Sequence, residues 1–239
     1  MDFSIIADNF GIYLQGLGNT LILVSISLVL GLLMAVPLAV LRLSAPPVVQ
    51  APIRAFVYFF RGTPLLVQMF LVYYGLGQFE AVKESILWPL FREAYFCALF
   101  TFTLNTCAYT TEFLRGAMYA TPQGEIEAAK AAGMSSLLMY RRIILPSGFR
   151  RALPAYSNEM IFMLHGSALA SVITIIDITG AARIINSRFY SPYEAFITAA
   201  LMYMSITFTI VFLVRRVEKR WSRHLLPQEQ VESNMEAPL

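Results

Sequence analysis

Long stretches without a charged residue alternate with short charged clusters along this chain. Five of these stretches are apolar and approach the 17–25 residues that cross about 30 Å of hydrocarbon as a helix. The predicted spans are residues 16–41, 56–78, 95–114, 156–176 and 195–214. The pattern therefore predicts an all-α, polytopic membrane protein with five transmembrane helices, in which residues 1–226 form a single domain.

The third and fourth predicted spans are short and contain polar residues. Thr103, Asn105, His165 and Ser167 would be unfavourable on a helix that faces lipid. Polar groups at membrane depth usually face the interior of a helix bundle. We therefore expect these two spans to lie inside the bundle.

The basic residues are distributed unevenly between the two sides of the predicted spans. Arg61 at the mouth of span two and the segments after spans one, three and five together account for 14 of the 18 Lys and Arg residues. Basic residues concentrate in cytoplasmic segments of membrane proteins. The sequence thus predicts an exterior N-terminus and a cytoplasmic C-terminus, which requires an odd number of spans.

Composition agrees with a membrane protein and excludes other classes. The chain is 57% hydrophobic and 14% charged, with a mean hydropathy of +0.61, whereas soluble domains are about 25% charged. No face or tail combines clustered basic residues with aromatics, so nucleic-acid binding is not indicated. Residues 227–239 are polar and without periodicity, which predicts a disordered cytoplasmic tail.

The cytoplasmic segment between spans three and four, residues 120–147, is unusually long and helix-prone. It is rich in Ala between Ala128 and Ala132, and is interrupted at Gly133 and again at Pro146, which predicts helix, turn, helix. Small side chains permit the close approach of another protein. On the residues alone, two interpretations stay open: a docking element for a cytoplasmic partner, or an amphipathic hairpin at the membrane surface with Arg141 and Arg142 near lipid phosphates.

The spacing within this segment resembles the EAA loop of the membrane subunits of bacterial ABC importers. The residues that carry the resemblance are Glu127, Ala128, Ala129, Gly133, Ile143, Leu145 and Pro146. Residues 61–68, 105–112, 115–117 and 156–159 resemble the polar-amino-acid branch of that family, and in detail the histidine, lysine, arginine and ornithine permeases.

The resemblance implies the type I ABC importer permease fold in the bacterial inner membrane. It also implies three partners: a cytoplasmic ATPase dimer, a second homologous permease subunit or a copy of this chain, and a periplasmic amino-acid-binding protein. The chain has no Gly-x-x-x-x-Gly-Lys-Ser/Thr phosphate loop, so ATP-Mg would be bound by the partner ATPase. We expect no cofactor, metal or catalytic residue in this chain.

Two sets of residues are then candidates for function. The coupling set, which would dock on the ATPase, is Glu127, Ala128, Ala129, Gly133, Leu137 and Leu138. The substrate set is Asn158, Glu159, Thr103, Asn105, Ser167 and Ser171. The expected function is import of a polar, cationic L-amino acid (arginine, lysine, histidine or ornithine) by alternating access.

The substrate set has ordinary structural explanations as well. Glu159 would open span four on the cytoplasmic side, where it could pair with Arg150 or Arg151. The resemblance favours the functional interpretation, because related importers are thought to bind substrate through the Asn-Glu pair at this position. Ser and Thr often only bridge neighbouring helices. His165 fits a proton relay or a neutral core histidine, and Glu112 fits a pair with Arg115.

Other functions are less well supported by the sequence. An intramembrane hydrolase needs facing catalytic groups, and only His165 and His224 supply imidazoles. A self-sufficient carrier or channel is disfavoured, because such carriers are usually built from duplicated halves. Within the importer class, opine, glutamine or cystine remain alternative substrates.

Overall fold

The computed structural model describes residues 3–221, which form a bundle of helices without strands. The long helices are α2 (Phe10–Ser44), α3 (Pro47–Gly62), α7 (Ala94–Tyr119), α10 (Leu145–Gly166) and α12 (Pro192–Trp221). The shorter ones are α1 (Ser4–Asp8), α4 (Leu65–Phe70), α5 (Glu80–Lys83), α6 (Trp88–Phe91), α8 (Gln123–Ala131), α9 (Ser136–Met139) and α11 (Ile178–Phe189). Irregular helical turns at Leu71–Gly75, Leu76–Gln78, Tyr140–Ile144 and Ser167–Ile173 connect them.

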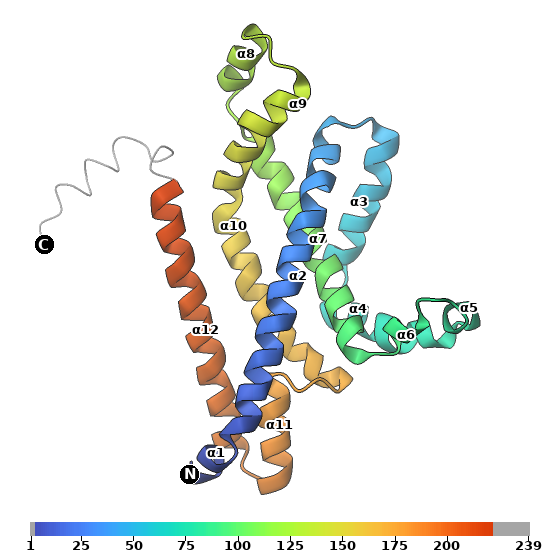
Figure 1. The fold of residues 1–239 in the computed structure, drawn as a ribbon, viewed down its shortest axis with the longest axis vertical. Coiled ribbons are helices and arrows are strands. Elements are labelled where there is room, and N and C mark those ends of the chain that lie inside the picture. The colour runs from blue at the N-terminus through green and yellow to red at the C-terminus, as the bar shows by residue number, and fades with distance from the viewer. Residues whose placement is uncertain (1–2, 222–239) are drawn as a thin grey trace, which may run out of the picture.

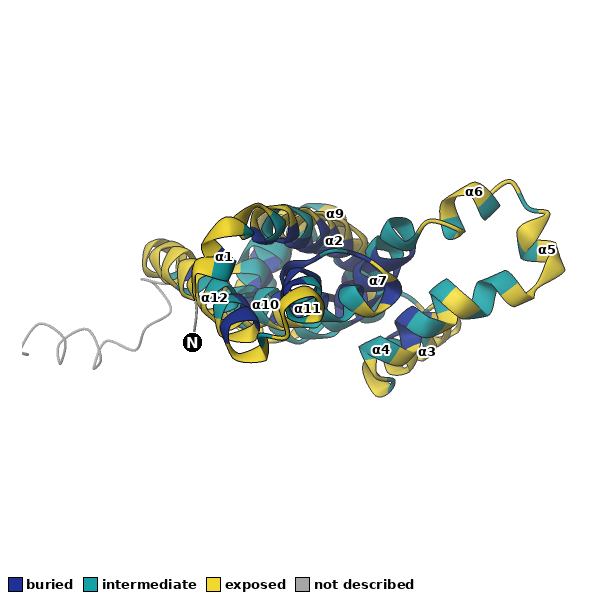
Figure 2. Ribbon diagram, turned by 90° about the horizontal axis from the view of Figure 1, so that it is seen from below, coloured by how far each residue is buried: buried dark blue, intermediate teal, exposed yellow. Residues whose placement is uncertain are grey.

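The core lies where α2, α7 and α10 meet, and Figure 2 shows the buried residues gathered there. Helix α7 contacts α2, α3 and α10 and buries Thr103 and Asn105, as predicted for the third span. Gly31 of α2 allows α7 to approach closely, because a Cβ at this position would lie 2.3 Å from Cγ2 of Thr106. Helices α3 and α4 pack against α7, and α5 and α6 extend away from the core (Figures 1 and 2).

The second predicted span is sharply bent, which the sequence prediction did not include. Helix α3 and the segment Leu65–Gln78 meet at 107°. Thr63 is extended, with φ −118° and ψ 145°, and Pro64 follows it. The proline ring disfavours the helical conformation of the residue before it, so the helix stops at Gly62 and restarts at Leu65.

The fourth predicted span ends in a break held by Asp177. The Ser167–Ile173 turn is followed by Thr174, which adopts φ +74°. The Asp177 carboxylate then accepts hydrogen bonds from the backbone N–H groups of Gly180 (2.8 Å) and Thr179 (3.2 Å) at the start of α11. The hydroxyl of Tyr203 donates to the same carboxylate at 2.9 Å. This N-cap fixes α11 at the end of the molecule next to α1 and the start of α12 (Figure 1).

Among the described helices, α2 and α12 are each long and apolar enough to cross a membrane without a partner segment. Two bent pairs qualify as further spans, α3 with Leu65–Gln78 and Ser136–Ile173 with α11. The number of five spans and the N-out, C-in orientation stay predictions. The predicted disordered tail at residues 227–239 lies outside the described residues.

The segment 120–147 is a helical hairpin at the end of the molecule opposite α1 and α11 (Figure 1). Helix α8 ends at Ala131, and Gly133 turns the chain with φ +73°, a conformation that favours glycine. The predicted interruption at Pro146 is wrong, because the chain stays helical there. The preceding π-helical turn, Tyr140–Ile144, accommodates the proline. In this turn the N–H of Leu145 donates to the carbonyl oxygen of Tyr140, and Pro146, at the start of α10, needs no N–H.

Candidate functional site

A small cavity of about 260 Å³ opens between α4, α7 and α10. Its lining residues are Leu65, Asn105, Tyr109, Glu159, Phe162 and Met163. Two polar groups, the Glu159 carboxylate and the Asn105 amide, thus face a cavity that is otherwise mostly apolar. Few, well-placed polar groups in an apolar cavity are typical of small-molecule sites.

Glu159 is 6% exposed, and none of the ion pairs found among residues 3–221 involves it. The alternative in which it pairs with Arg150 or Arg151 is therefore not seen. Arg61 lies beside this cavity, with its guanidinium 5.4 Å from the centre of the ring of Tyr109, one of the lining residues. A buried carboxylate without a direct ion-pair partner is a strong attractor for a cationic ligand.

The amide of Asn105 is oriented by Gln68, a buried residue that the sequence analysis did not select. Gln68 Nε2 donates to the carbonyl oxygens of Phe60 (2.8 Å) and Thr63 (3.0 Å). Because both acceptors are carbonyls, the nitrogen of Gln68 must face them and its Oε1 must face away. This oxygen accepts from Asn105 Nδ2 at 2.9 Å. Oδ1 of Asn105 is thereby left as the free polar atom of that amide, so this oxygen and the Glu159 carboxylate are two hydrogen-bond acceptors that line the cavity together with Tyr109.

Replacing Gln68 by Met is expected to raise the substrate concentration for half-maximal ATPase stimulation several-fold, because Asn105 would no longer be held with its oxygen toward the cavity. Stability should fall as well, since the freed backbone carbonyls cost about 1–3 kcal/mol when left unpaired. Thr63→Ser is the matched control, because it keeps the hydroxyl that accepts from Gln68 Nε2 at 2.8 Å. Half-saturation measured on the folded fraction distinguishes positioning from stability, and an unchanged value in Gln68→Met would contradict this role.

The remaining substrate candidates lie elsewhere. Asn158 is exposed, since successive residues of a helix point about 100° apart and Glu159 takes the inward direction. Thr103 is buried, two residues from Asn105 on another face of α7. Ser167 is buried and donates to the Leu164 carbonyl at 2.7 Å, so its hydroxyl is already satisfied. The structure therefore brings Asn105 and Glu159 together and separates the other four.

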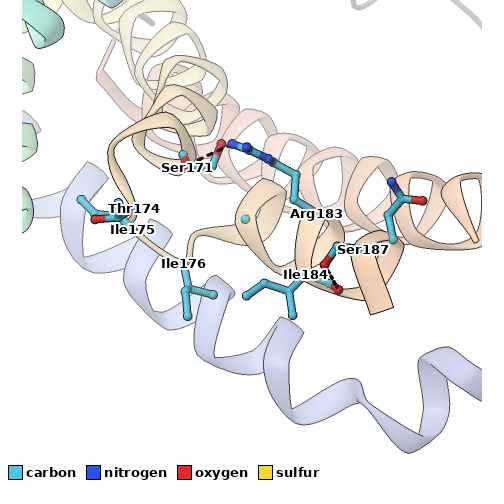
Figure 3. Close-up of a pocket in the computed structure, with 9 residues that line it drawn as sticks. Ser171, Thr174, Ile175, Ile176, Arg183, Ile184 and Ser187 are labelled. Carbon is cyan, nitrogen blue, oxygen red and sulfur yellow. Dashed lines mark hydrogen bonds between the residues drawn. The ribbon is translucent and has the colours of Figure 1, made fainter. Parts of the chain in front are cut away.

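Ser171 lines a second cavity, of about 470 Å³, beside α11 (Figure 3). Arg183 reaches across it and donates from Nη1 to the Ser171 carbonyl at 3.0 Å. Ile176 and Ile184 lie on its other side (Figure 3). The charged group here is a cation, so this cavity differs in character from that of Glu159.

His165 is exposed on the described chain, and its Nε2 lies 3.3 Å from Oγ1 of Thr207. It is therefore not a core histidine of this chain. The predicted pair of Glu112 and Arg115 is confirmed, with Nη2 of Arg115 at 2.5 Å from Oε1. Arg42, which was not anticipated, donates to the other oxygen of Glu112 at 2.9 Å.

The coupling candidates occupy the outer surface of the hairpin, with one exception. Glu127, Ala128 and Gly133 are exposed, and Leu137 is 80% exposed although it is a large apolar residue. Leu138 is half-buried. Ala129 is buried, since it points inward to a cavity of about 560 Å³ between α8 and the start of α10. Ala129 thus supports the hairpin, whereas Glu127, Ala128, Gly133 and Leu137 form an open surface.

Comparison with known proteins identifies the family. Residues 27–223 match the family described as the binding-protein-dependent transport system inner membrane component. The chain belongs to this family. It is 49% identical over 216 residues to the histidine/lysine/arginine/ornithine transport system permease protein HisM of Salmonella typhimurium, covering 90% of this chain and 92% of that protein. It is 45% identical over 226 residues to the nopaline transport system permease protein NocM of Agrobacterium fabrum, covering 94% of each.

Solved structures agree with this family. A chain from the crystal structure of an amino acid ABC transporter with histidines superposes with a TM-score of 0.82 at 33% identity, over 92% of this chain and 99% of that one. A chain of the MetNI methionine ABC transporter, at 17% identity and a TM-score of 0.71 over 90% of this chain and 98% of that one, shares the fold. The family member described here is thus a membrane permease subunit of an ABC amino-acid importer and an inner-membrane protein, and it is not itself an enzyme.

Proposed function

We propose that this permease forms the translocation path for a cationic L-amino acid such as arginine, lysine, histidine or ornithine. The observation that carries the proposal is the pair of acceptors in the small cavity, the buried Glu159 carboxylate and Oδ1 of Asn105. An ammonium or guanidinium group donates hydrogen bonds and accepts none, so it complements two acceptors in an apolar surrounding. The similarity to HisM supports the same substrate class.

The proposed topology has five spans, with the hairpin end in the cytoplasm. The ends of α2, α7 and α12 and the start of α3 lie at the hairpin end (Figure 1). The basic residues of these segments, and those of the Tyr140–Ile144 turn and the start of α10 next to the hairpin, therefore gather there; they include Arg42, Arg115, Arg142, Arg151, Arg216 and Arg220. This concentration supports a cytoplasmic location for that end.

In the proposed mechanism, an ATPase dimer binds the outer surface of the α8–α9 hairpin and moves it during ATP binding and hydrolysis. The hairpin continues through the Tyr140–Ile144 turn into α10, which carries Glu159. Movement of the hairpin would therefore change the access of the cavity to either side of the membrane. A second permease subunit, or a copy of this chain, and a periplasmic binding protein complete the proposed assembly.

A substrate panel tests this function. The complete importer, reconstituted in proteoliposomes, should show ATP hydrolysis stimulated by arginine, lysine, histidine or ornithine and little by neutral amino acids. Glutamine, cystine and nopaline belong in the panel, the last because NocM is a nopaline permease. Stimulation by nopaline or a neutral amino acid alone would overturn the cationic assignment. Flux driven by a gradient through the permease without ATPase subunits would instead indicate a self-sufficient carrier.

A further inference from the structure

A second group of polar side chains lies between the ends of α2, α3 and α7, at the hairpin end of the molecule. It lines an open cavity of about 420 Å³. The residues of this arginine cavity are Arg42, Leu43, Gln50, Arg54, Tyr58, Glu112, Arg115 and Tyr119. It is separate from the Glu159 cavity, with which it shares no residue.

The arginine cavity carries an excess of positive charge. Its lining residues include Arg42, Arg54 and Arg115, against the single carboxylate of Glu112. Both oxygens of that carboxylate are already engaged, one by Arg42 at 2.9 Å and the other by Arg115 at 2.5 Å. Arg54 has no carboxylate partner within residues 3–221 and donates to Oε1 of Gln50 at 2.6 Å. Two positive charges are therefore not neutralised by the lining residues.

One donor in the arginine cavity is buried without an acceptor. The side chain of Arg42 is only 8% exposed, and its Nε has no hydrogen-bond partner within the described chain. A buried N–H of a charged group that makes no hydrogen bond is unfavourable. An anion with several oxygens, seated in the cavity, would accept hydrogen bonds from the guanidinium nitrogens that reach it and offset the excess charge.

The surroundings of the cavity point to the membrane as the source of such an anion. Tyr58 and Tyr119 line it and are 69% and 77% exposed, and Phe59 and Val48 on α3 are 49% and 83% exposed. Tyrosines with apolar neighbours are typical of the depth of lipid headgroups. Arginine binds phosphate through two parallel hydrogen bonds, which a carboxylate-free guanidinium such as that of Arg54 can still form.

We propose that the arginine cavity binds a phosphate group, supplied by the headgroup of an anionic phospholipid. The phosphate would lie between Arg54, Arg115 and Arg42, with the acyl chains along the exposed apolar face of α3. Inorganic phosphate offers the same chemistry from solution, so the test has one arm for each source. This site is distinct from the translocation path, and its occupancy does not require the cationic-substrate proposal.

The test uses the complete importer in nanodiscs of phosphatidylcholine with increasing phosphatidylglycerol, and native mass spectrometry of retained phospholipid. Arg54→Gln is expected to lower retention of phosphatidylglycerol at least about ten-fold, the effect of losing one hydrogen bond between charged groups at a specific site. Arg54→Lys, which keeps the charge, should lower phosphatidylglycerol retention less than Arg54→Gln does. Arg216→Gln on α12 removes the same charge from another exposed site of the hairpin end and should leave retention unchanged.

In the second arm, inorganic phosphate is titrated into phosphatidylcholine nanodiscs and thermal stability is followed. Stabilisation that is lost in Arg54→Gln supports the phosphate site with solution as its source. The proposal is overturned if neither phosphatidylglycerol retention nor phosphate stabilisation depends on Arg54. It is equally overturned if Arg216→Gln lowers both to the same extent, because that result would indicate attraction by net charge alone.

Discussion

Replacing Glu159 by Gln is expected to raise the arginine or lysine concentration for half-maximal ATPase stimulation roughly 10- to 100-fold. The substitution keeps the size of the side chain and removes the charge that would pair with the substrate cation. A hydrogen bond to a charged group contributes about 1.5–3 kcal/mol, which corresponds to this range. Folding should be little affected, because Glu159 makes no ion pair within residues 3–221.

Asn158→Ala is the control for this experiment, since Asn158 is adjacent in sequence but exposed on another face of α10. Its substrate concentration for half-maximal ATPase stimulation should stay close to that of the unmodified importer. Thermal stability of both variants in the same detergent separates binding from folding. If Glu159→Gln shows unchanged half-saturation for arginine and lysine, Glu159 does not bind the substrate and the cationic assignment loses its main support.

The sequence was sufficient for the helical class and for the hairpin turn at Gly133, and it selected Glu159 and Asn105, which line one cavity, while their role in substrate binding stays a prediction. Each depends on local information: hydropathy over a window, a glycine that permits positive φ, and a polar residue at membrane depth. The bend at Thr63 could have been predicted from Pro64. Its angle could not, because it depends on how α4 packs against α7.

Residues that act through another helix were missed. Gln68 is an ordinary polar residue in the sequence, and its role follows from carbonyls on α3 and an amide on α7 that meet only in the fold. Arg42 and Glu112 are separated by 70 positions along the chain. Conversely, Asn158 was selected with Glu159 because the two are adjacent, whereas successive helical residues point about 100° apart and only Glu159 of this pair lines the cavity.

The cavity and the hairpin are joined by one continuous helical path. Glu159 lies fourteen residues after Leu145, the first residue of α10, which corresponds to roughly 20 Å of helix at about 1.5 Å per residue. A displacement at the start of a helix is transmitted to a side chain further along it, and in α10 the path passes Pro154. A partner that moves the hairpin would thereby act on the carboxylate proposed to hold the substrate, although the two are far apart.

Gly133→Asp is expected to abolish coupling while leaving the permease folded and inserted. Gly133 has φ +73°, and no atom lies within 4 Å of a Cβ added to it. Asp is among the residues that adopt this conformation most readily, so the strain is limited to about 1 kcal/mol. The new side chain would project from the exposed surface formed with Glu127 and Ala128, adding bulk and negative charge where the ATPase is proposed to bind. Substrate-stimulated ATP hydrolysis should fall at least about ten-fold, the effect of 1.4 kcal/mol.

Gly133→Asn separates the two contributions, because Asn has nearly the same shape as Asp, tolerates positive φ and carries no charge. If contact requires the absence of a side chain, both variants lose co-purification with the ATPase; if charge dominates, Asn retains much of it. Either result places Gly133 at the docking surface. A Gly133→Asp importer that co-purifies with its ATPase and keeps full substrate stimulation would refute that placement, and the hairpin would then have to be considered a membrane-surface element held by Arg141 and Arg142.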